Sequence, residues 1–272
     1  MRSIRHRFGR LGVTPIAVAV AVAALAACGN SPAVATGEGV RVEIVPGPNY
    51  RHEFPLFWFF SLRNAPQMVL WSETLDGDFI ETLMVTRKLG TDGWSRAPGD
   101  ETAGQTLTRP SAAPVWSYRS GRAPAATRAD GVSASTADGA AREASIPLDA
   151  VTRATPKRES ALDVSLPGAS AVRCYLYLEV NHSTDFNDAY PVDALPGEPG
   201  YSGGPYGSGQ PSLIYRASVD LLDPEQSDRV FTLVGHGSPE GSDGEVVTDL
   251  VGITTALQIV DEVRLHVDAA RM

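Results

Sequence analysis

The sequence predicts an all-β protein, a β-sandwich of immunoglobulin-like or jelly-roll-like type with long loops and one short helix. Roughly nine short segments alternate apolar and polar residues with the period of two that is typical of half-buried strands. Clusters of Gly, Pro, Asn and Asp separate these segments. Only one stretch, near the C-terminus, carries helix-start signals. Many short strands with turn signals and little helix favour two packed sheets.

The strands of the first half begin at Val40, where apolar residues alternate with charged ones up to Ile44. Gln67–Ser72 and Phe79–Val85 form the clearest hairpin, with Asp76-Gly77 as its turn. The first arm of this hairpin is apolar on both faces, so we expect it to be central in a sheet. The aromatic stretch Phe54–Leu62 favours buried or membrane-proximal packing; the alternative is an exposed surface for a carbohydrate or a partner.

The middle of the chain loses the strand pattern. Residues 90–146 are dominated by Ala, Ser, Thr, Gly and Pro. The part from about Ser117 to Ser145 has too few apolar side chains to offset the entropy of ordering. We therefore expect a disordered insertion at about 117–145.

The second half predicts five further strands and the short helix. Asp249 and Thr254-Thr255 are the candidate capping residues of this helix, which runs through Val260. The expected strands are 161–166, 171–180, 212–222, 229–234 and 262–267.

The N-terminus has the layout of a secretory signal peptide. Four arginines precede an uncharged apolar segment, Leu11–Ala27, which is short for a membrane span. Leu25-Ala26-Ala27-Cys28 resembles a bacterial lipobox. The resemblance implies cleavage after a leader of residues 1–27 and a diacylglyceryl group on Cys28. We expect residues 28–38 to be a tether, residues 39–272 to be one domain, and the protein to be lipid-anchored in the cell envelope, facing the periplasm or the exterior.

Charge and cysteine content agree with export. The chain has a net charge of −9, and without the four arginines of the leader it retains 19 basic against 32 acidic residues, a net charge of −13. Such a surface repels phosphate backbones, which argues against nucleic-acid binding. With Cys28 lipidated, Cys174 has no partner, and we expect an inert buried thiol.

The segment Asp149–Thr155 predicts the most specific chemistry. Asp149, Thr152 and Thr155 match a flavinylation signal, Asp-x-x-Ser/Thr-Gly-Ala-Thr, in which the last threonine accepts FMN through a phosphate ester. Arg153 stands where the signal has glycine, and its bulk argues against transfer. The alternative is a loop in which Asp149 and Thr152 hydrogen-bond to local backbone.

A family resemblance includes this segment. Its residues are Trp71-Ser72-Glu73, Asp76-Gly77-Asp78-Phe79, Thr82-Leu83, Asp149-Ala150-Val151-Thr152, Glu179-Val180-Asn181, Asp185 and Asn187. Over most of residues 65–267 the chain is similar to an uncharacterised family of predicted bacterial periplasmic proteins. The resemblance implies export and a β-rich fold, and it brings no activity or catalytic residues.

An oxygen-rich stretch at the end of a predicted strand is a candidate calcium site. It offers Glu179, Asn181, Asp185, Asn187 and Asp188, and hard oxygen ligands at such spacing suit Ca²⁺. The alternative is a turn in which these side chains cap backbone N–H groups. His182 lies in the same stretch, and it meets His236 only if the ends of their strands lie together.

Gly200-Tyr201-Ser202-Gly203-Gly204 matches the Gly-x-Ser-x-Gly pattern of hydrolases, but it lacks the strand and helix of a nucleophile elbow. A hydrolase would need Ser202, His236 and an aspartate. The sequence thus favours a non-enzymatic binding or structural lipoprotein with an unknown envelope partner or ligand. A covalent FMN carrier on Thr155 is the alternative.

Overall fold

The computed structural model describes residues 39–57, 60–91, 93–94, 109–122, 151–153, 160–166, 173–221, 223 and 228–267. All of them belong to the unit Thr36–Met272. The expected leader 1–27, the tether 28–38 and Cys28 lie outside the described residues.

One sheet has four antiparallel strands in the order β10-β12-β1-β7. Val42 of β1 lies opposite Leu265 of β12 on one side and Leu162 of β7 on the other. Along β1, Val40, Val42 and Ile44 are buried, while Arg41 and Glu43 project from the opposite face. The period of two in the sequence therefore becomes one buried and one solvated face. The strands are β1 (Gly39–Pro46), β7 (Ser160–Ser165), β10 (Arg229–Val230) and β12 (Val260–Val267).

The other sheet has six strands in the order β11-β9-β8-β4-β5-β6. β4 and β5 form the expected hairpin, and Gly77 in its turn has φ +93°. β4 lies between β5 and β8, as its two apolar faces predicted. All pairs are antiparallel except β5 with β6. The strands are β4 (Gln67–Glu73), β5 (Phe79–Thr86), β6 (Val151–Arg153), β8 (Arg173–Asn181), β9 (Leu213–Asp220) and β11 (Thr232–His236).

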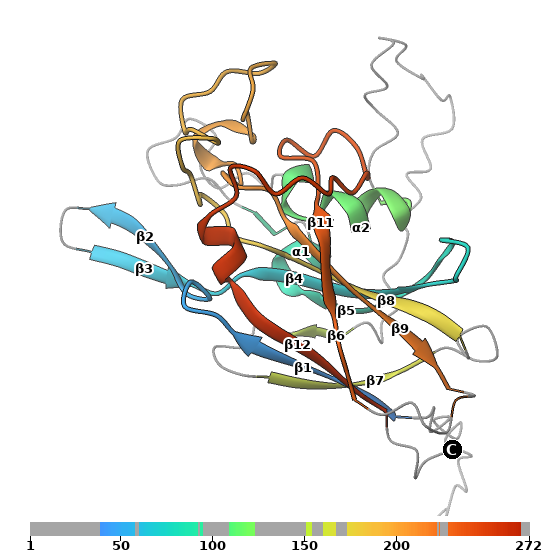
Figure 1. Ribbon diagram of the computed structural model, residues 1–272. Helices are drawn as coiled ribbons and strands as arrows, with labels where there is room; N and C mark the ends of the chain where they lie inside the picture. Colours follow the sequence, from blue (N-terminus) through green and yellow to red (C-terminus); the bar gives the residue numbers. More distant parts are fainter. Residues whose placement is uncertain are drawn as a thin grey trace, which may run out of the picture. The chain divides into compact units, whose positions relative to one another are not determined.

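Each face of the six-stranded sheet covers a hydrophobic core. The main core lies between the two sheets and joins residues such as Val42 and Leu265 to Leu70 and Leu178. The second core lies on the other face, where Trp71 packs with Trp116. In Figure 1 the four-stranded sheet lies below the six-stranded sheet, and α2 lies above it. The fold is thus an all-β sandwich with a small helical layer on one sheet.

The helices differ from the sequence prediction. The expected single helix near the C-terminus is one 3₁₀ turn, Thr255–Gln258, and Thr254 makes no side-chain cap. The backbone N–H of Thr254 instead donates to Gln210 Oε1 over 2.6 Å. Two unpredicted short helices are α1 (Arg87–Thr91) and α2 (Pro114–Arg119), and further 3₁₀ turns span Pro110–Ala112 and Gly204–Tyr206.

The first residues of the expected disordered insertion, 117–122, are ordered, so the prediction was wrong for this part. Ser117 belongs to α2, whose Val115 and Trp116 are buried in the second core, so the segment around it is ordered by packing. Residues 123–145 of the expected insertion lie outside the described residues.

One expected strand, 229–234, is two strands on different sheets. β10 pairs with β12, and β11 pairs with β9. Phe231 lies between them, is buried in the main core, and donates its N–H to Val263 O over 2.8 Å. The chain therefore crosses from one sheet to the other at Phe231.

The aromatic stretch 54–62 falls on a separate two-stranded hairpin, β2 (His52–Phe57) with β3 (Phe60–Asn64). Its side chains from residue 53 to residue 63 lie outside the described part. Among the helices that the structure describes, none has the length and hydropathy to cross a bilayer.

Candidate functional site

Glu179 on β8 is a fully buried carboxylate that binds the start of α2. Its Oε2 accepts the backbone N–H of Trp116 over 2.9 Å. Its Oε1 accepts the N–H of Val115 over 3.3 Å and the hydroxyl of Ser212 over 2.6 Å. These N–H groups have no partner within the helix, and a carboxylate near them also interacts favourably with the helix dipole. Glu179 thus holds α2 on the six-stranded sheet.

The same burial perturbs the ionisation of Glu179. Burial raises the pKa of Glu179 to about 7, although its hydrogen bonds with Ser212, Trp116 and Val115 and the charge of Arg119 act in the opposite direction. A carboxyl group with a near-neutral pKa is a common mark of a functional site, but structural networks produce it as well. Here every described contact of the carboxylate is made with a group of the fold itself.

A second buried carboxylate, Glu73, binds the other end of α2. Both of its oxygens accept Arg119 Nη1, over 2.9 and 2.8 Å, and Oε1 also accepts Trp71 Nε1 over 2.7 Å. The guanidinium of Arg119 lies 5.3 Å from the centre of the Tyr177 ring. Glu73 was not predicted as a site residue, because the sequence around it gives no indication of a contact with residue 119. α2 is therefore tied to the sheet by one carboxylate at each end.

The remaining candidate calcium ligands hold two separate loop segments. Asn181 Nδ2 donates to Ser111 O over 2.8 Å, so it binds the same segment as Glu179. Asn187 Nδ2 donates to Gly252 O over 2.9 Å, and its Oδ1 accepts two backbone N–H groups of its own turn. Asp188 is exposed. Within the described part of the chain, no group of three or more His, Cys, Asp or Glu side chains is placed to hold a metal ion.

Asp185 has the least complete set of partners in this group. Its Oδ1 accepts the hydroxyl of Thr255 over 2.7 Å, whereas Oδ2 is buried and has no hydrogen-bond partner. Burial raises the pKa of Asp185. The neighbouring backbone is tight: Thr184 has φ +63°, which is unusual for a β-branched residue, and Gly209 packs against the Asp185 backbone.

Gln210 joins this loop region from the next segment. It is buried, its Oε1 accepts the N–H of Thr254, and its Nε2 donates to Thr255 Oγ1. The sequence alone gave no signal for Gln210, which looks like an ordinary loop residue. The loops at 182–190, 207–210 and 252–256 are therefore one hydrogen-bonded unit.

His182 meets a histidine other than the one the sequence suggested. The rings of His182 and His52 lie 5.4 Å apart, and His182 Nε2 lies 3.0 Å from Asn49 O. Burial lowers the pKa of His182 to about 4, and the charge of His52 acts in the same direction. His236 instead contacts Gly237 O through Nδ1 over 2.7 Å.

The candidate hydrolase residues have structural partners. Ser202 Oγ accepts the N–H of Gly209 over 3.1 Å. None of the described contacts joins Ser202 to His236. Their positions therefore lend no support to a shared nucleophile and base.

The flavinylation-like segment is described only in part. Thr152 belongs to β6, which pairs in parallel with β5 at the edge of the six-stranded sheet, with Thr152 opposite Val85. Asp149 and the candidate acceptor Thr155 lie outside the described residues. Cys174 is buried in the main core, where burial raises the pKa of its thiol to about 11.

Comparison with known proteins adds no family to this description. No protein-family model matches the chain, and no curated protein and no solved structure matches it. The resemblance to uncharacterised periplasmic proteins stays a prediction.

Proposed function

We propose that this chain is an envelope lipoprotein, anchored through Cys28, whose β-sandwich acts as a non-enzymatic binding or structural module. The contacts of two buried carboxylates support the non-enzymatic binding or structural role. Glu179 and Glu73 direct all their described contacts to α2, its neighbours and the sheet. They fix surface segments in place, which is what a module that presents loops to a partner requires.

The presented surface has two parts. One is the helical layer around α2 on the six-stranded sheet. The other is the loop unit in which Asp185, Asn187 and Gln210 bind the segment 252–256. Both are fixed by buried side chains, and Val251, next to the segment 252–256, is an exposed apolar residue that an envelope protein or ligand would contact.

The anchor is tested by expressing the full chain in a bacterium and measuring its intact mass and its partition into detergent. The expected product lacks residues 1–27, carries a diacylglyceryl group on Cys28 and enters the detergent phase. Cys28→Ala abolishes both the lipid mass and the partition, while Cys174→Ala, the matched control, changes neither. A wild-type protein that keeps its leader and stays in the aqueous phase would refute the proposal.

A covalent FMN carrier is the second candidate, and one observation favours it. Val151–Arg153 is an extended strand at the edge of its sheet, and Thr155 follows two residues later in the sequence. The described part of the segment therefore has the extended backbone that a transferase requires. The test is the intact mass after co-expression with an FMN transferase. A gain of one FMN that is lost in Thr155→Ala but kept in Thr152→Ala supports the carrier. An unchanged mass in the wild type and in Arg153→Gly, which restores the signal, removes it.

A further inference from the structure

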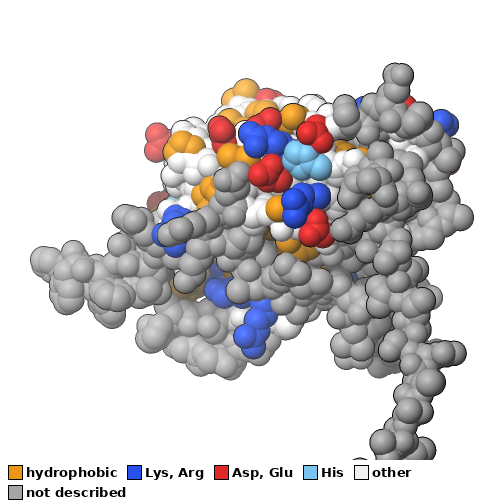
Figure 2. Space-filling model, turned by 90° about the horizontal axis from the view of Figure 1, so that it is seen from below, with side chains coloured by type: hydrophobic (Ala, Val, Ile, Leu, Met, Phe, Trp, Pro, Cys, Tyr) orange, Lys and Arg blue, Asp and Glu red, His pale blue; other side chains and the backbone are white. Residues whose placement is uncertain are grey.

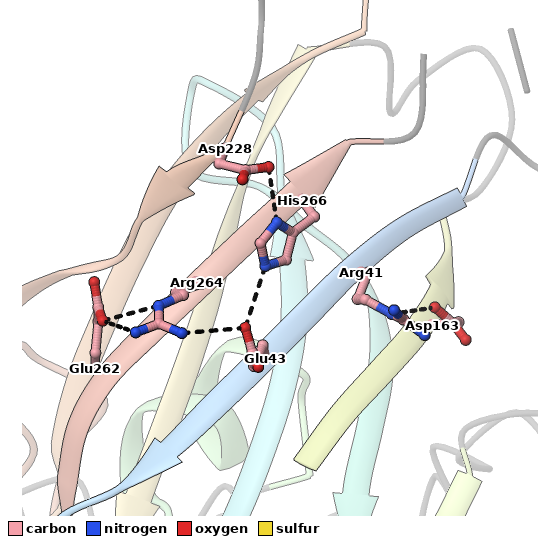
Figure 3. A network of polar contacts seen from close by, with 7 residues as sticks. All are labelled: Arg41, Glu43, Asp163, Asp228, Glu262, Arg264 and His266. Atoms are coloured by element: carbon pink, nitrogen blue, oxygen red, sulfur yellow. Dashed lines mark hydrogen bonds and ion pairs between the residues drawn. The ribbon is translucent and has the colours of Figure 1, made fainter. Parts of the chain in front are cut away.

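The outer face of the four-stranded sheet carries a chain of charged side chains. Asp228, His266, Glu43, Arg264 and Glu262 follow one another through hydrogen bonds and ion pairs (Figure 3). Figure 2, which shows this side of the molecule, has acidic, basic and histidine side chains next to one another. Most members of such a network on a solvated sheet face are ordinary surface ion pairs. His266 differs, because both of its ring nitrogens face a carboxylate.

The geometry around His266 fits only the protonated ring. Nδ1 lies 2.7 Å from Asp228 Oδ1, and Nε2 lies 3.3 Å from Glu43 Oε2. An ionised carboxylate accepts hydrogen bonds and donates none, and a neutral imidazole carries one N–H. Only the imidazolium therefore donates to both partners at once. In the neutral ring, one lone pair would face a carboxylate oxygen.

The two carboxylates come from different parts of the sheet. Glu43 belongs to β1, the neighbour of β12. Asp228 directly precedes β10, which pairs with β12 over only two residues, Arg229 opposite Leu265 and Val230 opposite Arg264. So short a strand gains little from its own ladder. The contact between Asp228 and His266 adds one side-chain bond to the pairing of β10 with β12. It lies shortly before the point where the chain crosses to the other sheet.

We propose that His266 is a pH-dependent clasp which, when protonated, joins Asp228 to Glu43 and holds β10 on the edge of the four-stranded sheet. Loss of the proton releases Asp228 and loosens β10. The backbone groups of Arg264 and Leu265 then become available at the sheet edge, where unpaired N–H and C=O groups accept added strands.

The other charges around His266 decide which carboxylate is released. Arg264 Nη1 lies 3.5 Å from Glu43 Oε2 and Nη2 lies 2.7 Å from Glu262 Oε2, so Glu43 keeps a cation when His266 is neutral. Arg41 lies opposite His266 in the register, but its Nε binds Asp163 of β7 over 3.0 Å. Arg229 of β10 reaches Ser218 over 3.5 Å. Within the described chain, His266 is the cation bound to Asp228, so the release occurs on the β10 side.

The shift in ionisation agrees with this geometry. The hydrogen bond from His266 to Asp228 raises the pKa of the imidazole, and Glu43 acts in the same direction, while burial opposes them. The folded protein therefore binds this proton more tightly than the unfolded chain does. The stabilisation is complete below the ordinary histidine pKa of 6.5 and is lost as the pH rises through the raised value.

The clasp is tested on the purified full-length protein by two measurements. The first is an NMR titration of the His266 ring. Asp228→Asn is expected to lower its midpoint more than Glu43→Gln does. The control Asp163→Asn, which removes a carboxylate of the same face that binds Arg41, leaves the midpoint unchanged. A midpoint that is the same in wild type and Asp228→Asn overturns the proposal.

The second measurement is hydrogen exchange of the peptide that contains residues 228–231, corrected for the intrinsic effect of pH. An exposed ion pair contributes little, so we expect about a two- to fivefold increase in exchange from pH 5.5 to pH 8.5 in the wild type. Asp228→Asn and His266→Gln should exchange at the faster rate at both pH values. Equal corrected rates at the two pH values in the wild type, or a pH effect that persists in Asp228→Asn, refute the clasp.

Discussion

Glu179 and His182 lie three residues apart at the end of β8, and burial shifts their pKa values in opposite directions. Burial raises the pKa of Glu179 from 4.5 to about 7 and lowers the pKa of His182 from 6.5 to about 4. Between pH 4.5 and pH 6.5 the folded protein keeps a proton on Glu179 that the unfolded chain releases. In the same range the unfolded chain binds a proton on His182 that the folded protein excludes.

The two effects have opposite signs in the stability. Stability rises with pH wherever the unfolded state binds more protons. His182 therefore makes the protein more stable as the pH rises from 4 to 6.5, and Glu179 makes it less stable from 4.5 to 7. Each effect amounts to a few kcal/mol in total, or about 1 kcal/mol per pH unit within its range. Asp185, whose pKa is also raised by burial, adds to the fall at the acidic end.

The wild type should hence show a shallow dependence of stability on pH between 5 and 6. Glu179→Gln removes the falling contribution and leaves stability rising with pH. His182→Gln removes the rising contribution and leaves stability falling. The assay is urea unfolding at pH 5.0, 5.5 and 6.0. The difference in unfolding free energy between each variant and the wild type should change by about 1 kcal/mol from pH 5.0 to pH 6.0. The difference rises for Glu179→Gln and falls for His182→Gln.

The slopes are informative even though both substitutions lower stability at every pH. Glu179→Gln places an NH₂ group between Ser212 and the N–H groups of α2, where the protonated carboxyl group has a second oxygen. Asp76→Asn, which removes an exposed carboxylate from the β4–β5 turn, is the matched control. If Glu179→Gln keeps the slope of the wild type, Glu179 does not carry the proton assigned to it and the reasoning fails.

Three further predictions concern the two cores and the loop unit. Arg119→Met leaves Glu73 buried without its cation and should destabilise the protein by about 2–3 kcal/mol in urea unfolding. Adding Glu73→Gln should restore part of this stability. An equal or larger loss in the double variant would contradict the pairing of Arg119 with Glu73. Gly209→Ala should lower stability by about 2 kcal/mol or more, since φ is +74° and a Cβ would lie 2.4 Å from the Asp185 backbone; an unchanged melting temperature would contradict this close approach. Cys174 should resist alkylation at pH 8 in the folded protein and react after unfolding, and rapid labelling of the folded state would show that the thiol is accessible.

Local alternation in the sequence was enough to predict most strands. β1, β4, β5, β8, β9 and β12 all coincide with segments expected from their pattern. Leu213, Tyr215, Ala217, Val219 and Leu221 alternate along the sequence, and all five are buried in the main core. Such a pattern is readable in strands that bury one face, such as β1, because the period of two records this directly. β4, which is buried on both faces, is instead marked by its continuous apolar run.

Contacts between distant segments limited the rest of the prediction. The segment 229–234 has one continuous pattern, yet Phe231 divides it between two sheets, because its neighbours are β12 on one side and β9 on the other. The helix α2 is six residues long and lies in a polar stretch, so its own sequence gives almost no helical periodicity. Its stability comes from burial of Trp116 and from Glu179, which lies more than sixty residues away along the chain.

The oxygen-rich stretch after β8 illustrates why residue type alone did not decide the candidate site. Carboxylate and amide oxygens that suit Ca²⁺ also accept hydrogen bonds from unpaired backbone N–H groups, so the same residues serve either purpose. Which purpose is met depends on the segments that fold against them. Here the 3₁₀ turn Pro110–Ala112 brings a C=O group to Asn181, and α2 brings N–H groups to Glu179. The segment 252–255 brings the hydroxyl of Thr255 to Asp185 and the carbonyl of Gly252 to Asn187. Glu179 and Asn187 accept backbone N–H groups, as the capping alternative expected, whereas Asn181 donates to a carbonyl and Asp185 accepts a hydroxyl. A metal ion would have to displace these bonds, which hold two loops and a helix in place.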